Sequence, residues 1–155
     1  MSEEEAAVKG SAVPACILGN AASDSLLRWS LLPLRVMLGG IMFAHGGQKA
    51  FGWFGGGGFS ATVQFLGQLH IPLPWPMAVL LVVAELIGGA MLVVGLAPRI
   101  AAAMNAIVMI VALLTAHRGN SFFETHTQQM ILAACVTIIL AGGGKLALQR
   151  SVPET

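Results

Sequence analysis

Residues 76–97 read PMAVLLVVAELIGGAMLVVGLA, an apolar run in which Glu85 is the one charged residue. A helix needs about 20 mostly apolar residues to cross the hydrocarbon core of a bilayer. The run lacks the alternation of polar and apolar residues that marks a strand of a membrane barrel. In lipid, the backbone groups of an isolated segment must bond within that segment. The run therefore predicts a transmembrane helix, and this prediction decides the fold class.

Three further runs with few charges lie at residues 29–47, 100–116 and 128–143. Pro98 and Arg99 allow only a tight turn between the second and third runs, so we expect these helices to be antiparallel neighbours. Together the four runs predict an all-α fold, a four-helix transmembrane bundle that occupies residues 26–150.

The composition of the chain supports the same class. Of its 155 residues 56% are hydrophobic and 10% are charged, and the mean hydropathy is +0.81. Soluble domains carry roughly 25% charged residues. A soluble globular enzyme is therefore excluded. The formal net charge of +1 gives no basic surface for nucleic acid, which excludes that class of partner as well.

The distribution of basic residues predicts the orientation. Four spans place both termini on one side of the membrane, and that side carries Lys9, Arg28, Arg99, Lys145 and Arg150. Lys49 and Arg118 lie on the other side. By the positive-inside rule both termini are cytoplasmic. Residues 1–25 are then predicted to be a flexible cytoplasmic tail.

The long outer loop at residues 48–75 contains a second helical pattern. After the glycines of residues 55–58, apolar residues recur at helical spacing, namely Phe59, Val63, Leu66 and Leu69. With Ser60 as its N-cap, this pattern predicts a short amphipathic helix over residues 60–69 that lies in the membrane interface. A loop that merely caps the bundle is the alternative.

Two ionisable residues fall inside the predicted spans. Arg35 lies in the first run and Glu85 in the second, and a charge at the centre of a bilayer costs roughly 2.5–3.5 kcal/mol on insertion scales. We expect such residues to be paired. The sequence predicts a buried Arg35–Glu85 pair assisted by Asn105 in the third helix. A functional polar site and an architectural ion pair both fit this pattern.

Small residues predict how the helices approach one another. Gly39 and Gly40 lie on the first helix, and Gly88 and Gly89 share a face with Glu85. Helix backbones come close where small residues meet in lipid. The third helix carries a similar seam of Ala102 and Ala106.

Polar residues also gather towards the predicted outer face. Arg35, Met42, His45 and Lys49 are spaced to share one face of the first helix. The predicted outer cluster consists of His45, Gln48, Lys49, His117, Arg118 and His126. The alternative is that each of these side chains only contacts water at the interface.

Motifs for other chemistry are missing from the sequence. There is no nucleophile triad, dinucleotide fingerprint or cysteine–histidine metal box, and Cys16 and Cys135 have no metal or redox spacing. We expect no disulfide, no metal site and no haem held by this chain alone. At most, the chain is a subunit of an enzyme.

Several stretches resemble the DoxX family of small four-helix membrane proteins. They are LR and LG at residues 34–35 and 38–39, FAHGGQK at 43–49, FGWFGG at 51–56, ELIGG at 85–89, Leu92, GL at 95–96 and FF at 122–123. The resemblance covers about residues 28–148. One departure is that Gly142-Gly143-Gly144 precede Lys145-Leu146-Ala147, without the acidic residue that often follows in that family.

The resemblance implies a role as well as a fold. Members of the family are described as subunits of oxidoreductases, some of them linked to quinone, in the bacterial cytoplasmic (inner) membrane. It therefore implies an accessory or anchor subunit with lipid and other membrane or redox proteins as partners, and a quinone as the possible cofactor. Two other functions stay open, a purely structural subunit of a larger assembly and a carrier of small molecules.

Overall fold

The computed structural model describes residues 21–119, 121–144 and 147, and within these residues it contains helices and no strand. Five α-helices and one 3-10 turn follow one another in the chain. They are α2 (Ala21–Phe51), the 3-10 turn η1 (Trp53–Gly55), α3 (Gly58–Gln68), α4 (Pro74–Val94), α5 (Pro98–Leu114) and α6 (Phe122–Ala141). The predicted all-α class is confirmed for this part of the chain.

All four predicted spans begin earlier than their apolar runs, α4 and α5 by two residues and α2 and α6 by more. α2 starts at Ala21, so residues 21–25 of the predicted tail are helical, while residues 1–20 lie outside the described part. α6 starts at Phe122 instead of residue 128, because Ser121 and Glu124 form a capping box. The Ser121 amide donates to Glu124 Oε2 over 2.9 Å. Caps, and not the edge of the apolar run, set where such a helix begins.

α2 and α4 form a closely packed antiparallel pair. A Cβ atom added to Gly39 would lie 2.7 Å from the Gly89 carbonyl oxygen, and one added to Gly46 would lie 2.6 Å from the Leu86 nitrogen. Because position 39 meets position 89 while the later position 46 meets the earlier position 86, the helices run in opposite directions. Gly40 has open space around it, so of the two neighbouring glycines only Gly39 makes the close approach.

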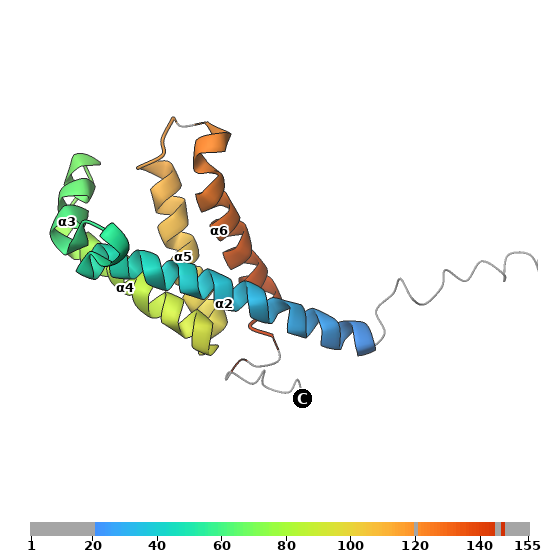
Figure 1. Cartoon of the computed structure of the whole chain (residues 1–155). Helices are drawn as coiled ribbons and strands as arrows, with labels where there is room; N and C mark the ends of the chain where they lie inside the picture. Colours follow the sequence, from blue (N-terminus) through green and yellow to red (C-terminus); the bar gives the residue numbers. More distant parts are fainter. Residues whose placement is uncertain (1–20, 120, 145–146, 148–155) are drawn as a thin grey trace, which may run out of the picture.

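α5 and α6 form a second pair that leaves the first at a steep angle (Figure 1). The two pairs meet along α4 and α5, where Gly88 of α4 faces the Asn105 amide of α5. We call the end that carries the α4–α5 turn the Gly143 end, because the chain after α6 returns there and Gly143 lies against Pro98. The opposite end of the α2–α4 pair carries α3, and we call it the α3 end.

Small and branched residues fill the contact between the two pairs. The buried cluster consists of Leu38, Met42, Leu92, Ala101, Ala102, Ala106, Met109, Ile131, Cys135 and Ile138. Ala102 and Ala106 therefore lie in the core, as their spacing predicts.

α3 folds back onto the last turn of α2. It begins after Gly57 and not after Ser60, which the sequence suggested as the cap. The Thr62 hydroxyl donates to the Lys49 carbonyl oxygen over 3.2 Å and ties the two helices together. Gly52, with φ of 76°, provides the left-handed turn between α2 and η1 that this reversal requires.

The described residues include one helix, α4, that is long and apolar enough to cross a bilayer by length and composition. α5 is apolar but shorter. Polar residues such as His45 in α2 and Gln128 in α6 lower the hydropathy of the other two long helices. Many large apolar side chains face outward, among them Leu80, Ile87, Ile107, Leu114, Met130 and Leu140.

Candidate functional site

Glu85 is fully buried, and its partner is Lys49. The carboxylate lies in the middle of α4 and the ammonium in the last turn of α2, and Lys49 Nζ donates to Glu85 Oε1. The side chain of Lys49 is 34% exposed, whereas that of Glu85 is 0% exposed. The predicted Arg35–Glu85 pair is therefore wrong.

The direction of helical side chains explains this correction. In an α-helix each Cα–Cβ bond tilts towards the N-terminus of its helix. Lys49 therefore reaches from the α3 end back along α2, and Glu85, on an antiparallel helix, reaches towards it. Arg35, on the same helix as Lys49, also reaches towards the Gly143 end, and its side chain therefore points away from Glu85. A comparison of how deep the residues lie along their helices does not show these side-chain directions.

Arg35 is held by backbone instead of by an acid. The residue is 2% exposed, and its guanidinium donates from Nη1 to the Gly143 carbonyl oxygen over 2.6 Å. A Cβ added to Gly95 would lie 2.8 Å from the same nitrogen, so the absence of a side chain there makes room for the arginine. Arg35 thus joins α2 to the α4–α5 turn and to the segment after α6.

Asn105 lies on the Glu85 side of the core. Its amide donates from Nδ2 to the Ala101 carbonyl oxygen over 2.9 Å and packs against Gly88, one turn along α4 from Glu85. Two buried acceptors in this region, Glu85 Oε2 and Asn105 Oδ1, have no hydrogen-bond partner among the described residues. A buried acceptor without a donor costs about 1–3 kcal/mol, so a polar ligand that donates a hydrogen bond is favoured here.

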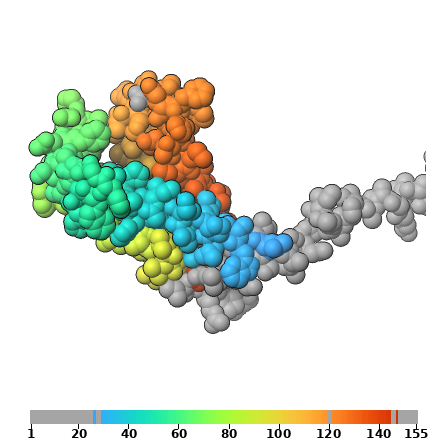
Figure 2. All heavy atoms as spheres, viewed as in Figure 1, coloured from blue at the N-terminus to red at the C-terminus, as the bar shows by residue number. Residues whose placement is uncertain are grey.

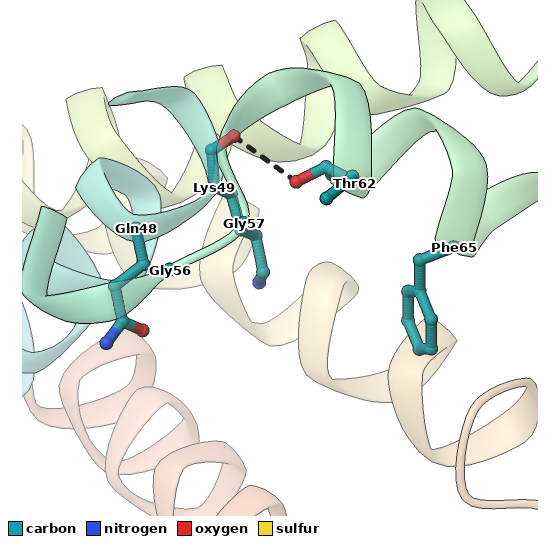
Figure 3. Close-up of a pocket in the computed structure, with 7 residues that line it drawn as sticks. Gln48, Lys49, Gly56, Gly57, Thr62 and Phe65 are labelled. Carbon is teal, nitrogen blue, oxygen red and sulfur yellow. Dashed lines mark hydrogen bonds between the residues drawn. The ribbon is translucent and has the colours of Figure 1, made fainter. Parts of the chain in front are cut away.

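A hollow of about 260 Å³ lies at the α3 end, on the exposed side of the Lys49–Glu85 pair. It is lined by Gln48, Lys49, Gly56, Gly57, Ala61, Thr62 and Phe65. The side chains of Gln48, Lys49 and Phe65 point to the same side of the α2–α3 unit (Figure 3). The surface is also hollowed between α3 and the far end of the α5–α6 pair (Figure 2).

The predicted outer cluster is only partly assembled. Gln48 and Lys49 line the hollow, while His45 is exposed on α2 and is not among the lining residues. His117 bonds within the α5–α6 unit, donating from Nδ1 to the Ala112 carbonyl oxygen and accepting from Gln128 at Nε2. His126 bonds the Phe123 carbonyl oxygen. The α5–α6 pair diverges from α2, and its two histidines therefore bond locally.

The residues that line the hollow from α3 were not predicted as site residues from the sequence. Thr62 and Phe65 lie on the predicted short helix, yet their part in the site depends on α3 folding back over α2. The glycines at residues 55–58, before α3, were the sequence feature that could have indicated this fold, since glycines permit such a reversal of the chain. Among the described residues, no group of three or more His, Cys, Asp or Glu is placed to hold a metal ion.

Comparison with known proteins places this arrangement in a family. The DoxX family model matches residues 30–118, which contain the hollow, Lys49 and Glu85. A curated relative from Bacillus subtilis (strain 168), named "Putative oxidoreductase CatD", is 36% identical over 122 residues, which are 76% of this chain and 82% of the relative. No solved structure matches the chain significantly. The resemblance noted in the sequence is confirmed, and the chain belongs to the DoxX family of membrane proteins.

Proposed function

We propose that this chain is an accessory, membrane-anchoring subunit of an oxidoreductase complex that exchanges electrons with the quinone pool. The observation that carries the proposal is the ion pair between the buried Glu85 and Lys49, a residue that lines the hollow. The family and the oxidoreductase name of the relative support it. The sequence holds no cofactor motif, and we propose that a partner protein supplies the redox centre.

The proposed placement is a four-helix bundle that crosses the bacterial cytoplasmic membrane with both termini in the cytoplasm. α4 meets the requirement for a span, and the outward-facing apolar residues of α4, α5 and α6 support burial of these helices in lipid. Lys49 and Arg118 lie away from the Gly143 end, which carries Arg99, and the sequence assigns Lys9, Arg28, Lys145 and Arg150 to the side of Arg99. The positive-inside rule then places the α3 end on the outer side.

The hollow suits the head of a quinone by its chemistry. A quinone carbonyl accepts hydrogen bonds, and Lys49 has two ammonium protons beyond the one it gives to Glu85. The Gln48 amide adds a donor, and the Phe65 ring adds an apolar face. Protonation of the ring oxygens accompanies quinone reduction, and Glu85 is a carboxylate placed to exchange that proton through Lys49. These side chains bind and move protons, while the electrons come from the partner.

Purification of the tagged chain from native membranes in a mild detergent tests the proposal. We expect co-purifying redox proteins and extractable quinone near one per chain. Lys49→Met and Glu85→Gln should each lower the quinone content at least severalfold while the partners remain bound. Arg118→Met is the matched control, because it removes an exposed charge outside the hollow and should leave the quinone content unchanged.

Two results would contradict the proposal. A folded chain that retains neither partner nor quinone would remove the redox role and direct attention to transport of small molecules. Partners that remain bound with no quinone in the wild type would favour a purely structural subunit.

A further inference from the structure

Two buried charged sites lie at different levels of the same helix pair. Lys49 and Arg35 are 14 positions apart on α2, which corresponds to about 21 Å along the helix axis at 1.5 Å per residue. Lys49 reaches Glu85 at the α3 end, and Arg35 reaches Gly143 at the opposite end. The side chains between these two levels decide from which end of the helix pair water and protons can reach Glu85.

The segment between the two levels is apolar and tightly packed. Leu38, Met42 and Leu92 are 3%, 0% and 0% exposed. Beside them Gly39 and Gly89 bring the backbones of α2 and α4 together, so closely that a Cβ added to Gly89 would lie 2.5 Å from the Phe43 nitrogen. Close-packed apolar side chains exclude water, and this segment therefore forms a seal between Glu85 and the Gly143 end.

The Gly143 end also carries positive charge. Arg35 is buried there against Gly95, and Arg99 lies near Gly142, where an added Cβ would be 3.7 Å from the guanidinium. A fixed arginine in a narrow path opposes the passage of protons and other cations. The apolar seal and the buried Arg35 therefore both oppose the movement of protons from the Gly143 end to Glu85, and the exposed Arg99 adds positive charge at that end.

The path from Glu85 to the α3 end is polar. Lys49 contacts the carboxylate and is 34% exposed at the hollow. Glu85 Oε2, an acceptor without a donor, belongs to this carboxylate, and Asn105, whose Oδ1 is the other such acceptor, packs against Gly88, one turn along α4 from Glu85. Lys49 is the charged group that faces Glu85 from α2, α3 carries no titratable residue, and α5 presents the uncharged Asn105. The titratable residue of α6 in the core is Cys135.

We propose that Glu85 exchanges its proton only with the membrane face at which α3 lies. The inference rests on the membrane placement proposed above, but not on the identity of the ligand. A proton that enters through the hollow converts the Glu85 carboxylate to the acid, Lys49 keeps its own proton, and the charge of the pair rises from zero to +1. Protons that a ligand in the hollow releases or takes up are therefore exchanged with the membrane face at which α3 lies.

One-sided thiol labelling tests this access in sealed, oriented vesicles. In a full-length chain carrying Cys16→Ser and Cys135→Ala, single cysteines are introduced by Glu85→Cys, by Gln48→Cys in the hollow and by Leu96→Cys in the exposed α4–α5 turn. A charged, membrane-impermeant methanethiosulfonate is added at one face, and the remaining free thiol is counted after solubilisation. We expect Glu85→Cys to react from the face that labels Gln48→Cys and to stay at background from the face that labels Leu96→Cys.

Asn105→Cys keeps the Lys49–Glu85 pair intact and covers the case in which Glu85→Cys does not fold. It should show the same sidedness, whereas Leu92→Cys, within the seal, should react from neither face. Reaction of Glu85→Cys or Asn105→Cys from the Leu96 face, or of Asn105→Cys from neither, would overturn the inference and leave the proposed function standing. If Gln48→Cys and Leu96→Cys react from the same face, the proposed membrane placement itself fails, and the inference fails with it.

Discussion

Two cations of α2, the partly buried Lys49 and the buried Arg35, differ in the groups that hold them. Lys49 is neutralised by a carboxylate, keeps one third of its side chain exposed and borders a hollow. Arg35 is nearly fully buried, donates to a backbone carbonyl and lies in contact with two glycine-containing turns. The comparison teaches that burial of a charge does not by itself make a functional site. Arg35 joins segments of the chain, whereas Lys49 borders the hollow in which we propose that a ligand binds.

The largest effect should follow loss of the Lys49 ammonium. In Lys49→Met the fully buried Glu85 has no cation, and removal of one partner of a buried pair costs about 3–5 kcal/mol. Glu85→Gln should lower the free energy of unfolding much less, because the partly exposed Lys49 side chain can rotate so that its ammonium contacts water. The free energy of unfolding in mixed micelles, measured by titration with dodecyl sulfate, checks the difference. Equal costs for the two variants would mean that the pair is not buried as described.

Arg35→Met should come next. It removes the charge-assisted hydrogen bond to Gly143, a loss of about 1.5–3 kcal/mol in the same titration. Quinone content should not change, because Arg35 lies on the far side of the seal. Arg99→Met, an exposed cation at the same end, serves as the control and should stay within about 0.5 kcal/mol of the wild type. A fall in quinone content with Arg35→Met would break the distinction between the two cations.

The close contact between α2 and α4 lies between the Lys49 and Arg35 sites. Substitution of two adjacent glycines of α2 tests it. Gly39→Ala places a methyl group against the α4 backbone and should cost about 1–3 kcal/mol through overpacking. Gly40→Ala meets open space and should be neutral or stabilising by about 0.5–1 kcal/mol, since alanine is the better helix former. The two variants change the same atoms one residue apart, so similar stabilities would rule out the close α2–α4 packing.

The smallest effect is expected far from both cations. Ser121→Ala removes the cap of α6 and should cost about 1 kcal/mol. Hydrogen exchange should quicken in the first turn of α6 and nowhere near Lys49 or Arg35. Thr127→Ala, at an exposed position of the same helix, should leave exchange at that first turn unchanged. A change in quinone content with Ser121→Ala would show that the α5–α6 turn belongs to the site.

Much of the fold could be predicted from single residues. The apolar run around Glu85 predicted α4, and Gly39, Gly89, Ala102 and Ala106 lie in close or buried contacts as their spacing suggested. The true starts of α2 and α6 were missed, because hydropathy reports where a helix is apolar and not where its hydrogen bonds begin. The pairing of Glu85 with Lys49 was also missed, because the depth of a residue along a span does not give the direction in which its side chain points.

The sequence by itself determined the helical class, the family and the set of polar residues that have to be satisfied in an apolar chain. This is so because a bilayer restricts its spanning segments to helices and makes every buried charge costly. Only the tertiary structure decided which partner each charge takes. Antiparallel packing of α2 and α4 directs Lys49 and Glu85 towards each other and Arg35 away from them. The return of α3 over α2 then brings Thr62 and Phe65 beside Gln48 and Lys49 and makes the hollow.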